Sequence, residues 1–213
     1  MNVQKIVLII MLLFSSLLGG RIGEKLCAQT RIRDIYAAAP DSIFPLLTKN
    51  NRLDQIDFRE NNMQAVVKNK FDDRVELLVL ADRYLKLQLS EHCIVEMRLL
   101  SDSTFCLVQT YNAPAPDSRI HLFDAAWNEL PMSIECPAVD DFLSEDIDID
   151  VRLSLQALPL IKASLSETDN SITFELQTSE LTREQRKQAE GKVREIIYPA
   201  ADAVVVALDN HLP

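Results

Sequence analysis

The sequence predicts an α+β protein in which N-terminal helices pack on a largely antiparallel meander sheet, with one longer helix near the C-terminus. Three observations predict this fold. Apolar residues recur at helical spacing up to residue 58, they alternate with polar residues from Met63 to Phe123, and a helix-capping signal begins at Thr182. The helices of the first third therefore precede the main sheet along the chain.

Short helices are predicted in the N-terminal third. Ile32, Ile35 and Tyr36 follow the i, i+3, i+4 spacing of one helix face. Residues 31–39 therefore form an amphipathic helix, and Pro40 ends it. Two further short helical stretches are predicted at residues 43–47 and 53–58.

From Met63 the alternation of apolar and polar residues is that of half-buried strands. Turn-forming residues separate consecutive segments, so the strands form an antiparallel meander. Val95 and Met97, for example, continue an apolar face opposite Glu96 and Arg98. The predicted strands are residues 65–70, 74–80, 83–89, 93–100, 104–111 and 119–123.

The C-terminal part is predicted to hold further strands and the late helix. Thr182 and Gln185 form a capping box that opens this helix. Its apolar stripe runs from Ala189 to Ile197, and Pro199 ends it. The strands predicted here are residues 151–155, 160–165, 171–177 and 203–208.

The first eighteen residues predict export. Lys5 places a positive charge ahead of residues 6–18, an almost unbroken apolar run of 13 residues, which is the pattern of a secretory signal. This run is shorter than the roughly 20 residues that a helix needs to cross a bilayer. Two cleavage positions are open, after Gly20 and after Ala28, and we expect the second.

Cleavage after Ala28 gives a signal peptide at residues 1–28 and a single α+β domain at residues 29–213. The alternative is two lobes with a junction near residues 136–150, where the chain is most acidic. Cys27 leaves lipid attachment as another alternative, although larger residues stand where small ones are wanted. The mature protein is expected in the periplasm or the cell envelope.

The composition is acidic. The chain has 22 Lys and Arg against 32 Asp and Glu, and loss of residues 1–28 removes three bases and one acid, so the mature net charge is −12. This charge disfavours nucleic acid and anionic membrane surfaces, because both bind clustered Lys and Arg. The protein is also expected not to span a membrane. The expected partner is a protein or a small ligand at the cell envelope.

Three cysteines remain after cleavage, in a compartment where disulfides form. An odd count leaves at least one thiol free or intermolecular. In the predicted hairpin Cys93 faces Tyr111 and Cys106 faces Arg98, so the two sulfurs lie about 16 Å apart along the ladder. No Cys93–Cys106 bond is predicted at that distance. All three cysteines, Cys136 included, are expected to be small buried residues.

Asp146, Asp148 and Asp150 form the candidate metal site. Carboxylates at alternate positions begin an EF-hand loop, but Val151 stands where the loop needs glycine and Ala157 where it needs glutamate. On an extended strand the three carboxylates share one face, which fits a solvated edge strand as well as a Ca²⁺ site. No cofactor is expected, and Ca²⁺ is the one alternative.

Trp127, the only tryptophan, is the candidate for a ligand or partner surface. The alternative is that it closes one end of the core, where large aromatic residues are usually buried. A Cys106–His121 pair lacks the electropositive surroundings that a reactive thiolate needs. The sequence contains no Walker loop, dinucleotide fingerprint, G-x-S-x-G elbow or H-E-x-x-H motif, so no catalytic residue is assigned.

The chain resembles an uncharacterised secreted family of the Bacteroidetes type in three segments. These are the run PDSIFPLLTKNNRLDQIDF at residues 40–58, residues 95–100, and residues 117–120 ahead of Trp127. The resemblance covers residues 31–180. Members of that family are known as a domain of unknown function. The resemblance therefore implies export and one family-wide domain, and it assigns no catalytic or binding residue.

The sequence predicts an exported envelope or periplasmic protein of unknown molecular function. The leading hypothesis is a non-catalytic protein that binds a partner or ligand through a sheet surface. One alternative is a hydrolase whose acid and base come from scattered Asp and Glu. The other is an adhesion module stabilised by Ca²⁺. An enzyme is the less favoured class, and the oligomeric state is not predicted.

Overall fold

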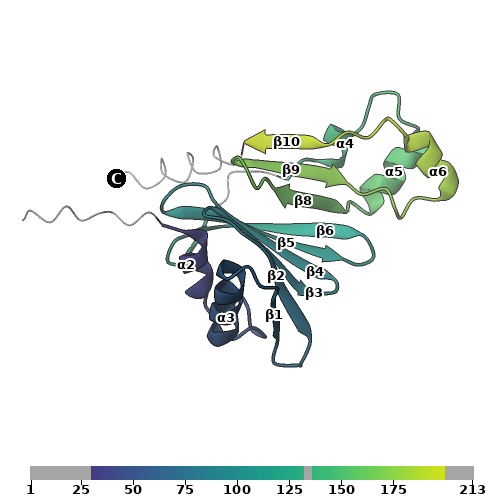
Figure 1. Cartoon of the computed structure of the whole chain (residues 1–213). Helices are drawn as coiled ribbons and strands as arrows, with labels where there is room; N and C mark the ends of the chain where they lie inside the picture. Colours follow the sequence, from purple (N-terminus) through teal and green to yellow (C-terminus); the bar gives the residue numbers. More distant parts are fainter. Residues whose placement is uncertain (1–29, 132–135, 200–213) are drawn as a thin grey trace, which may run out of the picture.

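A computed structural model of the chain describes residues 30–131 and 136–199 (Figure 1). The predicted signal peptide at residues 1–28 and the predicted strand at residues 203–208 lie outside the described residues. The described parts form five helices and two antiparallel sheets, which confirms the α+β prediction. None of these helices has the length and hydropathy of a membrane span.

The larger sheet is a meander in which each of seven strands pairs with the next one along the chain. The six strands predicted between residues 65 and 123 correspond to the first six strands of this sheet. The sequence does not predict the seventh strand, which is two residues long. The strands are β1 (Ala65–Lys68), β2 (Arg74–Leu80), β3 (Tyr84–Ser90), β4 (Cys93–Leu99), β5 (Thr104–Asn112), β6 (Pro116–Asp124) and β7 (Glu129–Leu130).

The register of the β4–β5 hairpin is as predicted. Cys93 pairs with Tyr111, and Arg98 pairs with Cys106. Since Cys93 and Arg98 are five residues apart on β4, the two thiols also lie on opposite faces of the sheet. Both are buried and free. Cys136 is exposed, so the prediction that all three cysteines are buried is wrong for this residue.

The N-terminal helices α2 (Ile32–Ala37) and α3 (Lys49–Glu60) cover one face of the larger sheet (Figure 1). Ile32 and Tyr36 on α2 are fully buried against strand residues of that face such as Met97. Residues 41–47 form consecutive turns between the two helices. Burial of this apolar surface is the main favourable term in the stability of the first core.

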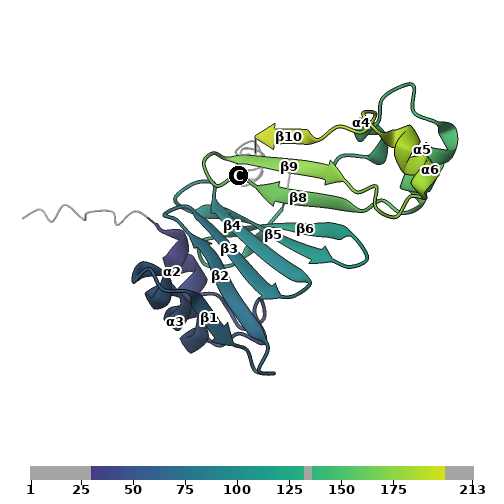
Figure 2. The ribbon, with the colours of Figure 1, turned by 45° about the vertical axis from the view of Figure 1, so that its right-hand side comes forward.

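A second sheet covers the opposite face of the larger sheet (Figures 1 and 2). Its strands are β8 (Ile161–Leu165), β9 (Ser171–Leu176) and β10 (Ile196–Pro199), in the order β10-β9-β8. β8 packs against β4, β5 and β6. Val108 and Leu122 from the larger sheet and Phe174 from β9 belong to the second core, while Leu107, next to Val108 on β5, belongs to the first.

Three short helices, α4 (Val139–Phe142), α5 (Ile149–Ala157) and α6 (Arg183–Ala189), complete the layer of the second sheet. The strand predicted at residues 151–155 is wrong, because this segment lies in α5. Val151 and Leu155, four residues apart, form the buried side of that helix.

The prediction of one longer helix near the C-terminus is also wrong. α6 has 7 residues, whereas α3 in the N-terminal third has 12. The capping box of Thr182 and Gln185 is present as predicted, but the helix ends at Ala189. Gly191 follows with φ +73°, a left-handed conformation that terminates helices and that glycine adopts without strain. Ile196 and Ile197 of the predicted apolar stripe therefore lie on β10.

Candidate functional site

The three aspartates of the predicted metal site lie at the start of α5. Asp148 is the N-cap of that helix, and its Oδ1 accepts the backbone N–H of Asp150 at 2.9 Å. Hydrogen bonds from Ser144 and Lys192 hold the pKa of Asp146 below its usual value. In residues 30–131 and 136–199 no group of three or more His, Cys, Asp or Glu is arranged to hold a metal ion. The prediction that the three aspartates lie on an extended strand is therefore wrong, because Asp148 and Asp150 begin a helix. The Ca²⁺ site stays a prediction.

We expect Asp148→Ala to lower the free energy of unfolding by about 1 kcal/mol, because it removes the side-chain cap of α5. Urea unfolding measures this loss, and Asp146→Ala, which removes an exposed partner of Lys192, is the control with a smaller effect. Because the carboxylates of Asp146 and Asp148 are engaged locally, millimolar Ca²⁺ is expected to leave the Tm unchanged. A Tm that rises with Ca²⁺ in the wild type and not in Asp148→Ala would contradict this account.

Trp127 closes one end of the first core. Its ring centroid lies 6.3, 4.8 and 5.4 Å from those of Phe44, Phe105 and Phe123. Its indole N–H donates to the carbonyl of Ile35 at 3.1 Å. The ring and its polar group are thus engaged within the protein, and a ligand surface at this residue stays a prediction.

Cys106 and His121 lie on opposite faces of the larger sheet, because His121 pairs with Leu107, the neighbour of Cys106 on β5. Burial, reinforced by the carboxylate of Glu96, raises the pKa of Cys106 to about 12. The thiol therefore stays protonated at neutral pH, and the two side chains cannot form a nucleophile–base pair.

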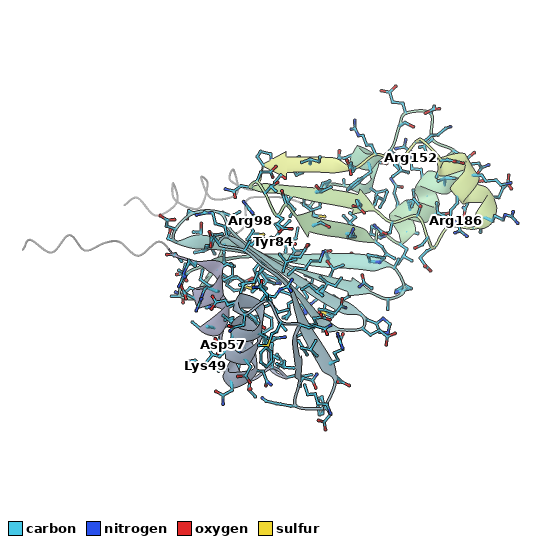
Figure 3. All side chains as sticks on the ribbon, viewed as in Figure 1. Lys49, Asp57, Tyr84, Arg98, Arg152 and Arg186 are labelled. Atoms are coloured by element: carbon cyan, nitrogen blue, oxygen red, sulfur yellow. The ribbon has the colours of Figure 1, made fainter. Side chains whose placement is uncertain are left out.

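A buried polar cluster that the sequence analysis missed lies between the two sheets (Figure 3). Glu96 and Arg98 on β4 and Tyr84 on β3 are 4%, 5% and 3% exposed. Tyr84 Oη donates to Glu96 Oε1 at 2.6 Å, and Lys86 Nζ lies 3.2 Å from the same oxygen. Burial and the bond to Glu96 raise the pKa of Tyr84 far above its usual value, so its hydroxyl remains a donor.

Arg98 extends the cluster to the turn that joins β8 and β9. Its Nε donates to Asn170 Oδ1 at 3.1 Å, and its Nη1 donates to the carbonyl of Glu167 at 2.8 Å. Asn170 in turn donates to the carbonyl of Leu100 at 3.2 Å. The turn is thereby fixed to the end of β4.

Side chains of the larger sheet also bind the free edge of β8. This strand pairs with β9 on its other edge, so alternate backbone N–H groups point away from β9. Three of these groups have side-chain acceptors on the larger sheet. The N–H of Ile161 donates to Asp117 Oδ1 at 3.2 Å, and that of Ala163 donates to Ser118 Oγ at 2.9 Å. The N–H of Leu165 donates to Glu96 Oε2 at 3.3 Å. Since a buried backbone N–H without a partner is costly, these bonds dock the second sheet on the first.

A crevice of about 320 Å³ opens where β8 meets the larger sheet. The polar residues of its floor and wall come from β3, β4, β5, β8 and the turn after β8, and include Lys86, Glu96, Asn112, Lys162, Ser164 and Glu167. Within the described part of the chain, the amide of Asn112, the hydroxyl of Ser164 and the carboxylate of Glu167 make no hydrogen bond or ion pair. The crevice therefore holds unpaired polar groups beside two ammonium groups.

Comparisons with known proteins agree with this fold. No curated protein is significantly similar to the chain. A solved structure, "Structure of a domain of an uncharacterized protein from Porphyromonas gingivalis W83", is similar over 83% of this chain and 96% of that one, with 21% identity and a TM-score of 0.69. At that identity the likeness concerns the fold alone.

The resemblance to a family of unknown function is confirmed by a match to the model of a protein family. The similar solved structure comes from Porphyromonas gingivalis, a member of the Bacteroidetes, and bears on the fold alone. The match covers residues 24–200, which is most of the chain, and its family is described as a protein of unknown function, DUF3256. The chain therefore belongs to the DUF3256 family.

Proposed function

We propose that the protein is a non-catalytic binding protein that holds a small polar ligand in the crevice between β8 and the larger sheet. The observation that carries this proposal is a single hollow that brings Asn112, Ser164 and Glu167 beside Lys86 and Lys162. The side chains of the first three have no polar partner in the part of the chain that the structure describes. Binding sites characteristically combine a concave surface with a few convergent polar groups.

We further propose that the protein acts after export, in the periplasm or the cell envelope. The charged start and the apolar run of residues 6–18 support this location, because they have the pattern of a secretory signal.

The crevice suits an amino-acid-sized ligand that carries both signs of charge. The carboxylate of Glu167 can accept from a ligand ammonium group. Lys86 and Lys162 lie 3.2 and 3.3 Å from Glu96 and Glu175, and each ammonium group has three donors, so both retain donors for a ligand carboxylate. The volume of about 320 Å³ is near the lower end of ligand pockets, roughly 300–1,000 Å³.

The buried carboxylate of the crevice supports binding rather than hydrolysis. Glu96 accepts from Tyr84 and from the backbone of Leu165, and it pairs with Lys86. These contacts satisfy the buried carboxylate, so a structural role alone explains why Glu96 is buried. A general acid or base must in addition reach a proton of the substrate.

The test is an NMR titration of the protein with L-alanine and with the dipeptide Ala-Ala. We expect amide shifts confined to the crevice, and Ser164→Trp, which fills it, should weaken binding by about tenfold or more. The control is Thr173→Trp, because Thr173 pairs with Ser164 on the same face of the second sheet and lies outside the crevice. Equal affinity of the two variants, or no binding of either compound, would contradict the proposal.

A further inference from the structure

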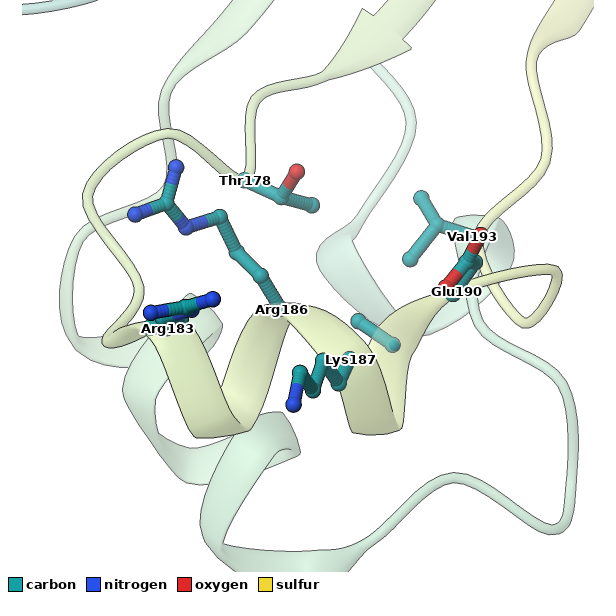
Figure 4. Close-up of a pocket in the computed structure, with 7 residues that line it drawn as sticks. Thr178, Arg183, Arg186, Lys187, Glu190 and Val193 are labelled. Atoms are coloured by element: carbon teal, nitrogen blue, oxygen red, sulfur yellow. The ribbon is translucent and has the colours of Figure 1, made fainter.

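A second hollow lies on α6, at the end of the molecule away from the N-terminal helices (Figures 1 and 4). Its volume is about 640 Å³. The residues that shape it include three cations of α6, namely Arg183, Arg186 and Lys187, together with Thr178, Glu190 and Val193. It shares no lining residue with the crevice at β8, so the two surfaces can be tested separately.

Three cations that have no ion-pair or hydrogen-bond partner among residues 30–131 and 136–199 gather in this hollow. Of the nineteen Lys and Arg among the described residues, fourteen either lie within 4.0 Å of a carboxylate or donate a side-chain hydrogen bond to another residue. The described cations for which neither holds are Lys49, Arg119, Arg183, Arg186 and Lys187. Three of them therefore belong to one short helix and one hollow.

This gathering creates a local positive potential on an acidic protein. The chain carries a net charge of −10, so carboxylates outnumber cations in the molecule as a whole. The three cations of the hollow are exposed, and no carboxylate of the described residues lies within 4.0 Å of their charged groups. Their counterpart is an anion from solution, which the positive potential attracts.

The arrangement of the cations suits a compact oxyanion. Arg183 precedes Arg186 by three residues and Lys187 by four, so the three side chains leave the same side of α6. Figure 4 shows Arg183 and Arg186 at one end of the hollow, with Glu190 and Val193 at the other. The acidic side chain is thus separated from the two guanidinium groups.

We infer that the Arg183–Arg186 end of the hollow binds a phosphate monoester group. A guanidinium presents a planar fork of N–H donors that matches two oxygens of one phosphate. Two guanidinium groups offer more donors than the two oxygens of a carboxylate ligand can use, whereas a phosphate monoester has three terminal oxygens. The hydroxyl of Thr178, which lines the same hollow, is a further donor. The phosphate is that of a soluble monoester or of a lipid headgroup, and these two sources share this chemistry.

The test compares two double variants of equal net charge. Arg183→Gln with Arg186→Gln removes two cations from the hollow. Lys49→Gln with Arg119→Gln removes two cations from elsewhere that likewise have no partner among the described residues. The probe in solution is phenyl phosphate, followed by amide shifts of residues 178–193. We expect the wild type and the Lys49/Arg119 variant to bind alike and the Arg183/Arg186 variant to bind about tenfold or more weakly, with affinity falling as salt increases.

Two further arms identify the source and guard against misfolding. In the first, each protein is sedimented with vesicles of phosphatidylcholine and phosphatidic acid. Co-sedimentation that depends on Arg183 and Arg186 assigns the site to a lipid phosphate. Binding of phenyl phosphate without co-sedimentation assigns it to a soluble monoester. Arg183→Lys with Arg186→Lys keeps the charge and is expected to restore only part of the affinity. Three results would overturn the inference. The two double Gln variants could lose affinity equally, the Arg183/Arg186 variant to Gln could bind as well as the wild type, or the folded wild type could bind neither probe.

Discussion

Glu96→Ala is expected to lower the free energy of unfolding by about 3–5 kcal/mol, the usual cost of removing one partner from a buried charged cluster. The side chain of Glu96 is 6% exposed. Its loss leaves the Tyr84 hydroxyl, the Lys86 ammonium group and the Leu165 backbone N–H without their acceptor between the two sheets. Urea unfolding followed by circular dichroism measures the change.

Two variants show whether the loss comes from the docking of β8. Glu96→Gln keeps an oxygen acceptor of similar shape and should be less destabilising than Glu96→Ala. Glu175→Ala removes a half-exposed carboxylate that pairs with Lys162 on the second sheet, so its loss should stay below about 1 kcal/mol. An effect of Glu96→Ala no larger than that of Glu175→Ala would show that Glu96 does not hold the sheets together.

Hydrogen exchange gives a local view of the same change. The amide of Leu165 loses its acceptor directly in Glu96→Ala, and the neighbouring edge amide of Ala163 depends on the same docking. Both should exchange faster, whereas amides in the β2–β3 pair, such as that of Leu87, should keep their protection. Uniform acceleration over the chain would indicate global destabilisation without local release of β8.

The larger sheet is predictable from sequence because its signals are local. Alternation with a period of two marks each strand, and turn residues such as those between β4 and β5 set the register. The pairing of Arg98 with Cys106 therefore follows from the hairpin alone. The short β7 has too few residues to carry a period.

α5 shows how a local pattern misleads. Ile149, Val151, Leu153 and Leu155 alternate with polar residues, which is the period of a strand. Val151 and Leu155 are also four residues apart, and in the helix they are buried while Ile149 and Leu153 are 61% and 54% exposed. The N-cap at Asp148 and the packing of one helix side override the alternation.

The polar cluster and the crevice could not be predicted, because they depend on a segment far along the chain. Glu96 and Arg98 stand on the polar side of β4, and alternation alone places that side in solvent. The second sheet covers it through bonds such as Leu165 N to Glu96, which joins residues 69 positions apart. No periodic signal in β4 or β8 reports such a contact.

Arg52→Met is expected to cost about 3 kcal/mol or more of unfolding free energy, because it removes two charged hydrogen bonds worth roughly 1.5–3 kcal/mol each. The side chain of Arg52 on α3 is 2% exposed. It donates to the carbonyl of Leu47 at 2.7 Å and to that of Ala39 at 2.5 Å. Both acceptors border the consecutive turns between α2 and α3, so the guanidinium supplies bonds that regular structure would otherwise provide.

Lys49→Met is the matched control, because Lys49 is exposed on the same helix and its substitution should change stability by less than about 0.5 kcal/mol. The near-ultraviolet circular dichroism of Trp127 reports on the turns themselves, since its ring packs on Phe44 within them. We expect that signal to weaken in Arg52→Met and to persist in Lys49→Met. If both variants unfold like the wild type, the turns are held by apolar packing of Phe44 and Leu47 alone, and the buried guanidinium contributes no net stability.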